Sequence, residues 1–395
     1  MNSPIPLKPY PLLCCPVYKA KIWGGRRLQT LFGKDLPEGE RIGESWEIAD
    51  LPEGSSSIAN GPLAGRSLSE VTAEWGSALI GQAWAASSDQ SDQSDQSDQS
   101  DQSDKSKGSP VSRGRFPLLV KLLDAQDDLS VQVHPSEKDC RAHFPEHHGK
   151  DESWIVLHSE PGGRVLHGFN AGVTAEDFKR RVAEGSVGGC LRVVEVKAGD
   201  VLRVAPGTVH AICRGVVLLE IQQPSDSTFR IYDYGRLGDD GKPRPLHLDL
   251  AESVLRFDVG PAFLAPRSHS FPWGRHEVVV DCPAYRIERF EISSPAGQVG
   301  PVGPAGPTSP TSPTRPTSRT GKILSWTVNA RSVQALVAIE GEGRLVAGGV
   351  TIEIRTGQSV ILPAAIGRVT LSCPALACFV LAGASGAPLL SSAVL

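Results

Sequence analysis

The sequence lacks the features that mark membrane and secreted proteins. No stretch approaches the roughly 18 consecutive apolar residues that a membrane helix needs. The first residues, MNSPIPLKPYPLLCCPV, are interrupted by prolines and hold no apolar segment that ends in a small-residue cleavage site, so we expect no export signal. These absences predict a cytoplasmic protein that does not bind a membrane.

Cysteine is scarce, and so is net charge. Eight cysteines in 395 residues are too few for a disulfide framework, and none has a metal-binding spacing, which favours a reducing compartment. The 40 Lys and Arg residues nearly balance the 44 Asp and Glu residues, and a net charge of −4 excludes the basic composition of a general nucleic-acid-binding protein. With 40% hydrophobic residues, the chain has enough apolar material for two or three folded domains.

Two segments lack the residues that build a core. Residues 88–104 repeat Ser-Asp-Gln without an apolar residue, which predicts a disordered, solvated insertion at about 87–114. Residues 293–322 are dominated by Pro, Gly, Ser and Thr without a strict Gly-X-Y period, which predicts a flexible loop rather than a collagen-like helix.

The remaining sequence is rich in short strands separated by Gly and Pro turns. Runs of β-type residues occur at 131–133, 153–157, 191–196, 201–204, 216–221, 229–232, 277–280, 285–292, 333–339, 350–354, 359–362 and 377–381. Helix signals are fewer, and the clearest are capping boxes at Ser67-x-x-Glu70 and Thr174-x-x-Asp177. This pattern predicts a mainly β protein of two sandwich or jelly-roll domains, residues 1–258 and 259–395, with helices added to the first.

A candidate metal site begins at Gln132-Val-His134. Positions i and i+2 of a strand point to the same face, so these two side chains would project side by side. Glu152 follows His134 by 18 residues, and His210 ends the segment GDVLRVAPGTVH, which reads as strand, turn and strand. Two imidazoles, a carboxylate and an amide oxygen are a good set for Zn²⁺. Each residue taken alone is explained equally well by a surface or core role.

Seven segments carry a resemblance to a known family. They are Trp23-Gly-Gly, IGESWE at 42–47, PLLVKLLDA at 117–125, LSVQVHP at 129–135, GKDESW at 149–154, GD…PGTVHAI at 199–212 and EIQQPSDSTFR at 220–230. Their order and spacing resemble the type I phosphomannose isomerases, the mannose-6-phosphate isomerase branch of the cupins, in the short bacterial form. The resemblance covers roughly residues 12–86 and 115–258. It implies two cupin-like jelly rolls and a zinc-dependent interconversion of D-mannose 6-phosphate and D-fructose 6-phosphate through an enediolate.

The resemblance also implies the site residues. The family holds one zinc ion per chain on Gln, His, Glu and His, and the matching positions are Gln132, His134, Glu152 and His210.

Four further residues in or next to these motifs are candidate catalytic residues. Arg230 matches the essential active-site arginine, and Asp226 matches an acidic position suited to proton transfer. Lys121 matches a family lysine on the strand that precedes QVHP, and Lys150, two residues before Glu152, would point to the same face of a strand as that ligand. The alternative for each of the four is a surface ion pair worth less than about 1 kcal/mol.

The sequence departs from the family pattern in two places. The turn before His210 reads Ala-Pro-Gly207 instead of the usual Pro-Ala-Gly, so we expect a slightly shifted turn that leaves Gly207 and His210 in place. The segment GQSVILPAAIG at 357–367 echoes that turn but carries Gly367 where the first copy has its histidine. The second domain is therefore expected to be a degenerate cupin without metal ligands.

Other functions remain open at this point. The same ligands could form the two-His-one-carboxylate site of an iron(II) cupin oxygenase, and Mn²⁺, Co²⁺ or Fe²⁺ could replace zinc. A third hypothesis is a regulator that binds a sugar phosphate without catalysing a reaction. The expected partner is a small phosphosugar, with no nucleic acid and no membrane. The sequence does not determine the oligomeric state, and a monomer is compatible with it.

Overall fold

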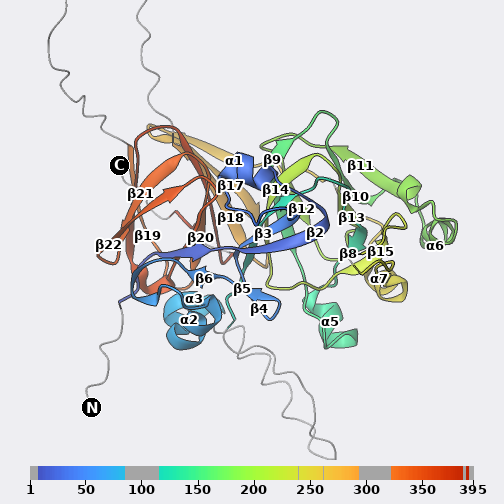
Figure 1. The fold of residues 1–395 in the computed structure, drawn as a ribbon, viewed down its shortest axis with the longest axis horizontal. Coiled ribbons are helices and arrows are strands. Elements are labelled where there is room, and N and C mark those ends of the chain that lie inside the picture. The colour runs from blue at the N-terminus through green and yellow to red at the C-terminus, as the bar shows by residue number, and fades with distance from the viewer. Residues whose placement is uncertain are drawn as a thin grey trace, which may run out of the picture.

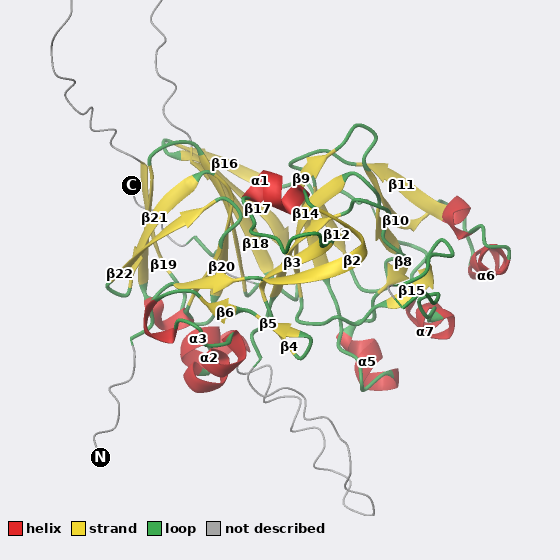
Figure 2. Ribbon diagram, in the orientation of Figure 1, coloured by secondary structure: helices red, strands yellow, loops and turns green. Residues whose placement is uncertain are grey.

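The computed structural model describes residues 8–84, 115–238, 240–260, 262–292, 322–385 and 388–390. The Ser-Asp-Gln tract and the Pro-rich segment, including the predictions made for them, lie outside these residues. Strands dominate the described chain (Figure 2), which confirms the mainly β fold. The strands of the described residues pair antiparallel, as expected for β-sandwiches.

The first pair of sheets contains most of the motif residues. One sheet has five strands, in the spatial order β11 (Leu191–Glu195), β10 (Arg164–Phe169), β13 (His210–Ile212), β8 (Val131–Val133) and β15 (Phe229–Tyr232). The other has six strands, in the order β12 (Val201–Val204), β9 (Glu152–Ser159), β14 (Val216–Gln222), β7 (Leu119–Asp124), β3 (Ile42–Ile48) and β2 (Val17–Gly25). A core between them includes Trp154 and Leu202 from one sheet and Val165 and Ile212 from the other.

The second pair of sheets is built mainly from the C-terminal part of the chain. Its larger sheet has the order β16 (Arg267–Phe271), β17 (Gly274–Asp281), β18 (Arg286–Ile292), β25 (Ala377–Gly383), β20 (Gln334–Glu340), β23 (Ser359–Leu362), β1 (Leu12–Cys15) and β6 (Ser57–Ile58). Its smaller sheet has the order β19 (Lys322–Thr327), β24 (Arg368–Cys373), β21 (Glu342–Ala347) and β22 (Val350–Arg355). Phe290 and Phe379 from the first sheet pack with Trp326 and Leu371 from the second. A two-stranded ribbon, β4 (Asp50–Leu51) and β5 (Gly54–Ser55), completes the strands.

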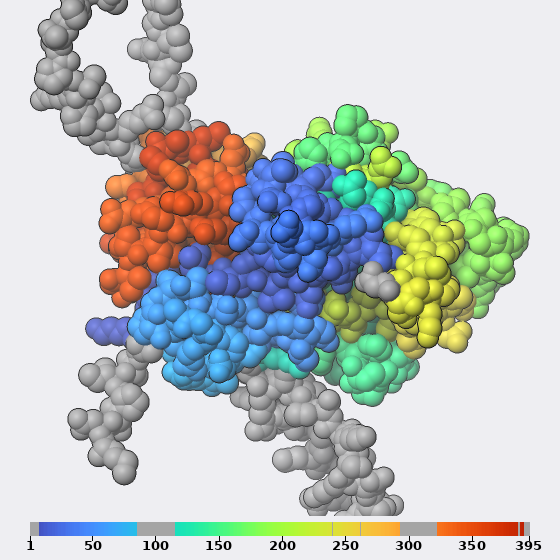
Figure 3. All heavy atoms as spheres, viewed as in Figure 1, coloured from blue at the N-terminus to red at the C-terminus, as the bar shows by residue number. Residues whose placement is uncertain are grey.

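The N-terminal strand joins the C-terminal sheet. Leu12 of β1 pairs with Ile361 of β23, and Cys14 pairs with Ile58 of β6. Figure 3 shows the blue N-terminal residues lying between the orange-red C-terminal part and the green and yellow part that carries the motifs. The two sheet pairs lie side by side along the long axis of the molecule (Figure 1). The division of the chain at about residue 258 stays a prediction.

Short helices lie between some of the strands along the chain. The α-helices are α1 (Arg27–Phe32), α2 (Leu68–Trp75), α3 (Ser77–Ile80), α5 (Glu137–His143), α6 (Ala175–Ala183) and α7 (Leu248–Val254), and the 3-10 helices are η1 (Gly61–Leu63), η2 (Val187–Cys190) and η3 (Ala364–Ile366). Both predicted capping boxes are confirmed: Ser67 accepts from the Glu70 N–H before α2, and Thr174 accepts from the Asp177 N–H before α6. No described helix is both long and apolar enough to cross a membrane. All eight cysteines are free thiols.

One buried carboxylate ties the C-terminal residues to the second sheet pair. Glu288 on β18 accepts hydrogen bonds from the Leu389 and Leu390 N–H groups at 2.9 and 3.1 Å. Its oxygens also lie 2.6 Å from Arg286 Nε and 2.9 Å from His276 Nε2. Burial alone would raise the pKa of Glu288, but these partners lower it to about 2.

This carboxylate predicts a pH-dependent loss of stability. Its folded-state pKa lies below the usual value of 4.5, so its stabilising effect is complete well above pH 4.5 and is lost as the pH falls towards 2. We expect Glu288→Gln to lower the unfolding free energy by about 3 kcal/mol at pH 7, and by roughly half as much at pH 3. Denaturant titrations at both pH values test this, with the exposed Glu342→Gln as the control. An equal deficit at both pH values would contradict the assignment.

Candidate active site

The candidate metal ligands come from both sheets of the first pair. Gln132 lies on β8 and pairs with His210, the first residue of β13. His134 follows β8 directly, whereas Glu152 is the first residue of β9 in the facing sheet. The site therefore lies inside the sandwich, where the two sheets present polar side chains to each other. His134, Glu152 and His210 are each about 1% exposed.

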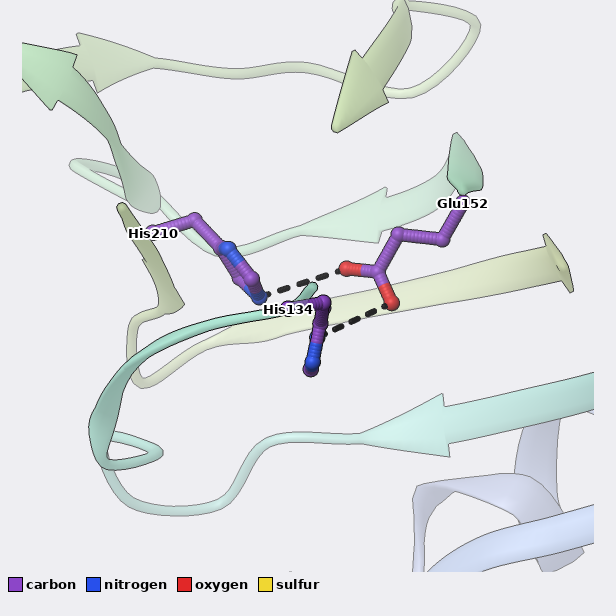
Figure 4. Close-up of side chains that lie close together, drawn as sticks. All are labelled: His134, Glu152 and His210. Atoms are coloured by element: carbon purple, nitrogen blue, oxygen red, sulfur yellow. Dashed lines mark ion pairs between the residues drawn. The ribbon is translucent and has the colours of Figure 1, made fainter. Parts of the chain in front are cut away.

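The Glu152 carboxylate faces both imidazoles, one oxygen towards each (Figure 4). Its Oε1 is 3.3 Å from His210 Nε2 and its Oε2 is 3.4 Å from His134 Nε2. The potential ligand atoms of the three residues all lie within 4.8 Å of one another. Two ligands that are each about 2.0–2.2 Å from a tetrahedral Zn²⁺ are themselves about 3.4 Å apart, so these separations suit a shared ion.

Hydrogen bonds orient both imidazoles for this role. Nδ1 of His134 lies 2.8 Å from the Ser227 carbonyl oxygen, and Nδ1 of His210 lies 2.9 Å from the Thr208 carbonyl oxygen. A carbonyl only accepts, so each Nδ1 carries the proton and each Nε2 presents a lone pair towards Glu152. Both Glu152 oxygens are buried without a well-oriented hydrogen bond. A buried carboxylate beside two imidazole lone pairs fits a divalent cation.

Gln132 completes the donor set. Its amide group lies 3.3 Å from His210 Nε2. Because a half-turn of an amide exchanges its oxygen and nitrogen, the Gln132 oxygen can take this place and serve as a neutral ligand.

Burial sets the protonation of the cluster. It lowers the pKa of His210 to about 3, because a buried imidazolium would lose its hydration. Burial, together with the nearby Lys150 ammonium, also lowers the pKa of His134. Burial would raise the pKa of Glu152, but Lys150 and the two imidazoles hold it well below its usual value. Neutral imidazoles and an ionised carboxylate are the forms that bind metal ions.

A glycine turn links the two histidine-bearing segments. The Gly207 N–H donates to the His134 carbonyl oxygen at 2.9 Å, three residues before His210. Gly207 has φ +85°, and a Cβ there would lie 2.7 Å from the Val254 carbonyl oxygen. The turn therefore needs glycine for its left-handed backbone and for the close approach of the 254–256 segment.

Lys150 lies beside the cluster, as its spacing from Glu152 predicts. Its Nζ is 2.9 Å from Glu152 Oε2 and 3.3 Å from His134 Nε2. The side chain is buried, so its charge acts on the cluster with little screening.

Lys121 belongs to a buried network on the six-stranded sheet. Its Nζ on β7 lies 3.2 Å from Glu220 Oε1 on β14 and 4.0 Å from Glu44 Oε2 on β3. Burial would lower the pKa of Lys121, but the two carboxylates raise it above its usual value. Burial would raise the pKa of Glu44, yet Lys121 and Lys21 lower it to about 2. Lys121 and Glu44 therefore both stay ionised at neutral pH.

A cavity of about 260 Å³ opens beside Gln132 and His210. Its walls include all four predicted catalytic residues, which are Lys121, Lys150, Asp226 and Arg230. Arg230 on β15 pairs with Gln132 on β8, and its Nη1 donates to the Pro245 carbonyl oxygen at 2.9 Å. Its Nε is buried, and no residue in the described part of the chain accepts a hydrogen bond from it. An arginine N–H in this state is suited to bind an anionic ligand.

Sequence reasoning missed three charged residues of this cavity: Glu220, Lys21 and Arg244. Glu220 could have been recognised from the sequence, because it interrupts the mainly apolar strand β14. A charged side chain buried there needs partners. Glu220 accepts from Trp154 Nε1 at 3.0 Å and pairs with Lys121. Lys21 and Arg244 had no local signal, since exposed basic residues are common.

The structure describes one cluster of this kind. Among the described residues, the group His134, Glu152 and His210 is the one set of three His, Cys, Asp or Glu side chains placed to share a metal ion. The described part of the second sheet pair contains no such group.

Comparisons with known proteins agree with this arrangement. A family model of the phosphomannose isomerase type I catalytic domain matches residues 82–161. The chain is 30% identical over 361 residues to the mannose-6-phosphate isomerase ManA of Bacillus subtilis, which covers 91% of this chain and 95% of that protein. It is 36% identical over 273 residues to the mannose-6-phosphate isomerase of Streptococcus mutans, which covers 69% of this chain and 76% of that protein.

Solved structures extend the likeness to three dimensions. The mannose 6-phosphate isomerase from Bacillus subtilis matches with a TM-score of 0.73 at 27% identity, over 94% of this chain and 99% of that one. A zinc-bound mannose 6-phosphate isomerase shares the fold, with a TM-score of 0.65 at 16% identity over 94% of this chain and 98% of that one.

Proposed function

The chain belongs to the type I phosphomannose isomerases, and from this premise we propose that it interconverts D-mannose 6-phosphate and D-fructose 6-phosphate with the help of one zinc ion. The observation that carries the proposal is the buried His134–Glu152–His210 cluster beside a cavity that also holds Arg230. The names of the homologous enzymes indicate the substrate, and the set of potential ligands in this chain suits a zinc ion.

Gln132, His134, Glu152 and His210 would hold the metal. Glu152 brings the single negative charge of this set, so the site would keep a net charge near +1. A zinc ion bound there would act as a Lewis acid that stabilises negative charge on the sugar oxygens.

The reaction moves protons between neighbouring atoms of the sugar. Going from aldose to ketose, a proton leaves C2 and a proton is added at C1, while O2 loses a proton and O1 gains one. The intermediate is an enediolate, which carries negative charge next to the cations of the cavity. Asp226 is an exposed carboxylate of the cavity wall and is our candidate for proton transfer.

Three basic residues would support this chemistry. Arg230 would bind the developing negative charge, using the Nε group that has no hydrogen-bond partner among the described residues. Lys150 would hold Glu152 ionised and add positive charge beside the reacting oxygens. Lys121, fixed between Glu220 and Glu44, would extend the positive surface of the cavity.

A coupled assay for fructose 6-phosphate formed from mannose 6-phosphate tests the proposal. We expect turnover that a chelator abolishes and that added zinc restores, because the ligands cannot polarise the sugar without the ion. Absence of turnover in protein with a full complement of zinc would contradict the proposal and favour another sugar or a regulatory role. Oxygen consumption by iron-loaded protein would instead favour the oxygenase alternative.

A further inference from the structure

The segment that follows β15 pairs two arginines with one carboxylate. Asp233 is buried, and its Oδ2 accepts from Arg244 Nε at 2.7 Å. Its Oδ1 accepts from both Arg244 Nη2 and Arg236 Nη2, the latter at 2.6 Å. Arg230, on β15 itself, lies next to this group, because its Nη1 donates to the carbonyl oxygen of Pro245. The single carboxylate offsets only one of the two positive charges that it binds.

The two arginines held by Asp233 differ in what they face. Arg244 lines the cavity together with Arg230 and Gln132, and Arg236 is absent from that lining. Arg236 is fully engaged elsewhere: its Nη1 donates to the Asp128 carbonyl oxygen, and its guanidinium lies 5.0 Å from the centre of the Tyr234 ring. Arg244 uses Nε and Nη2 on Asp233, and its Nη1 has no partner among the residues that the structure describes.

The backbone places Arg244 beside Arg230. The Arg230 N–H donates to His247 Nδ1 at 3.0 Å, and the His247 N–H donates to the Arg230 carbonyl oxygen at 2.7 Å. Arg230 Nη1 also donates to the carbonyl oxygen of Pro245, the residue next to Arg244. The 244–247 segment therefore runs along β15, and both arginines face one cavity with free N–H groups.

The positive charges of these arginines favour the binding of an anion. Burial lowers the pKa of Arg230, and the like charges of Arg244 and Arg236 lower it further. A phosphate monoester carries about −1.5 to −2 charges at neutral pH and offers three oxygens to such donors. Arginine is the side chain best matched to phosphate because its N–H groups form a planar fork.

We propose that Arg244, held in place by Asp233, binds the phosphate group of the substrate and thereby selects phosphorylated sugars. This inference rests on the proposed function, because it places the phosphate in the same cavity as the reacting carbons. It separates two roles: Arg230, paired with Gln132 on the neighbouring strand, faces the reacting end of the sugar, and Arg244 holds the distal end.

Replacing the arginine with alanine in zinc-loaded full-length protein tests the assignment. Arg244→Ala should raise KM for mannose 6-phosphate by at least about tenfold and leave kcat within about threefold, since a charge-assisted bond to the phosphate is lost while the reacting end is untouched. The inhibition constant of inorganic phosphate should rise by a similar factor. Asp233→Asn should also raise KM without lowering kcat, because it loosens Arg244 but keeps its charge.

Arg236→Ala is the matched control. It removes an arginine of the same segment and the same Asp233 partner, but no donor from the cavity. We expect KM and the phosphate inhibition constant to change by less than about threefold. An equal loss in Arg236→Ala would mean that Arg244 only maintains the fold of the segment, and would overturn the proposal. So would an Arg244→Ala variant with unchanged KM and unchanged phosphate inhibition.

Two further measurements distinguish a failure of this proposal from a failure of the proposed isomerase function. If Arg244→Ala does not fold, Arg244→Lys keeps the charge but not the fork, and KM for mannose 6-phosphate should still rise several-fold; an unchanged KM would overturn the proposal. If the wild-type protein does not isomerise mannose 6-phosphate, the proposed function fails. Calorimetric titration of wild type and Arg244→Ala with inorganic phosphate then decides the role of Arg244, because equal affinities would overturn it.

Discussion

Replacing His210 with alanine is expected to remove the bound metal and to lower turnover of mannose 6-phosphate by at least about a thousandfold. His210 Nε2 is one of two imidazole lone pairs that face Glu152, and its Nδ1 is committed to the Thr208 carbonyl oxygen. Without it, Gln132, His134 and Glu152 would have to hold the ion with one neutral nitrogen, one neutral oxygen and one carboxylate. Metal content per chain after dialysis and the initial rate measure the two effects.

His167 offers a matched control for this experiment. It lies directly opposite His210 on β10 and is equally buried, but its Nε2 lies 3.0 Å from the Arg203 carbonyl oxygen and not in the cluster. His167→Gln can keep a side-chain N–H for that carbonyl, so we expect it to retain both metal and turnover. Metal that persists at wild-type content in His210→Ala after dialysis would show that His210 is not a ligand.

Replacing Arg230 with alanine is expected to lower kcat by at least about a hundredfold while metal content stays at the wild-type level. The loss follows from the removal of a positive group from the cavity wall next to Gln132, where the proposed enediolate would carry its charge. None of the four proposed ligands is changed, so the ion should remain. Initial rates and metal analysis of the same preparation test both parts.

Two variants make the Arg230 result specific. Arg230→Lys should recover only part of kcat, because lysine keeps the charge but cannot form a planar fork of N–H groups. Arg214→Ala removes an exposed arginine outside the cavity lining and should behave like wild type. An Arg230→Ala variant that keeps more than about a tenth of wild-type kcat, or that loses its metal, would contradict the assigned role.

Strand positions were predictable because they depend on local pattern. The runs at 131–133, 201–204, 229–232 and 359–362 coincide with β8, β12, β15 and β23. The capping boxes at Ser67 and Thr174 were equally local signals, since the bonds that define them lie within four residues. The cupin-like fold followed from these runs together with the family resemblance, and it is confirmed.

Other features were missed although part of their signal was present. The helix α5 begins at a capping box in which Ser136 accepts from the Asp139 N–H, and this pattern stands in the sequence directly after His134. The apolar pattern after Ser67 runs through Trp75 and Leu79, but Gly76 ends α2 and a separate helix, α3, follows. In both cases the residues that begin or end a helix mattered more than the apolar spacing.

Pairing between distant strands could not be inferred locally. Strand β1 joins β23 of the C-terminal sheet, a contact across nearly 350 residues that no periodicity encodes. Glu220 and Lys121 stabilise each other only because β14 and β7 are neighbours in register. Each alone would be a costly charge inside an apolar strand, and the sequence does not reveal which partner offsets that cost.

The sequence by itself determined the strand-rich composition, the turn before His210 and the types of residue available as ligands, because these depend on neighbours within a few positions. Tertiary structure decided that Gln132, His134 and His210 from one sheet meet Glu152 from the facing sheet, and that Arg244 shares a cavity with Arg230. These contacts depend on how antiparallel strands pair and on how two sheets pack. Both are set by the burial of whole faces rather than by any single segment.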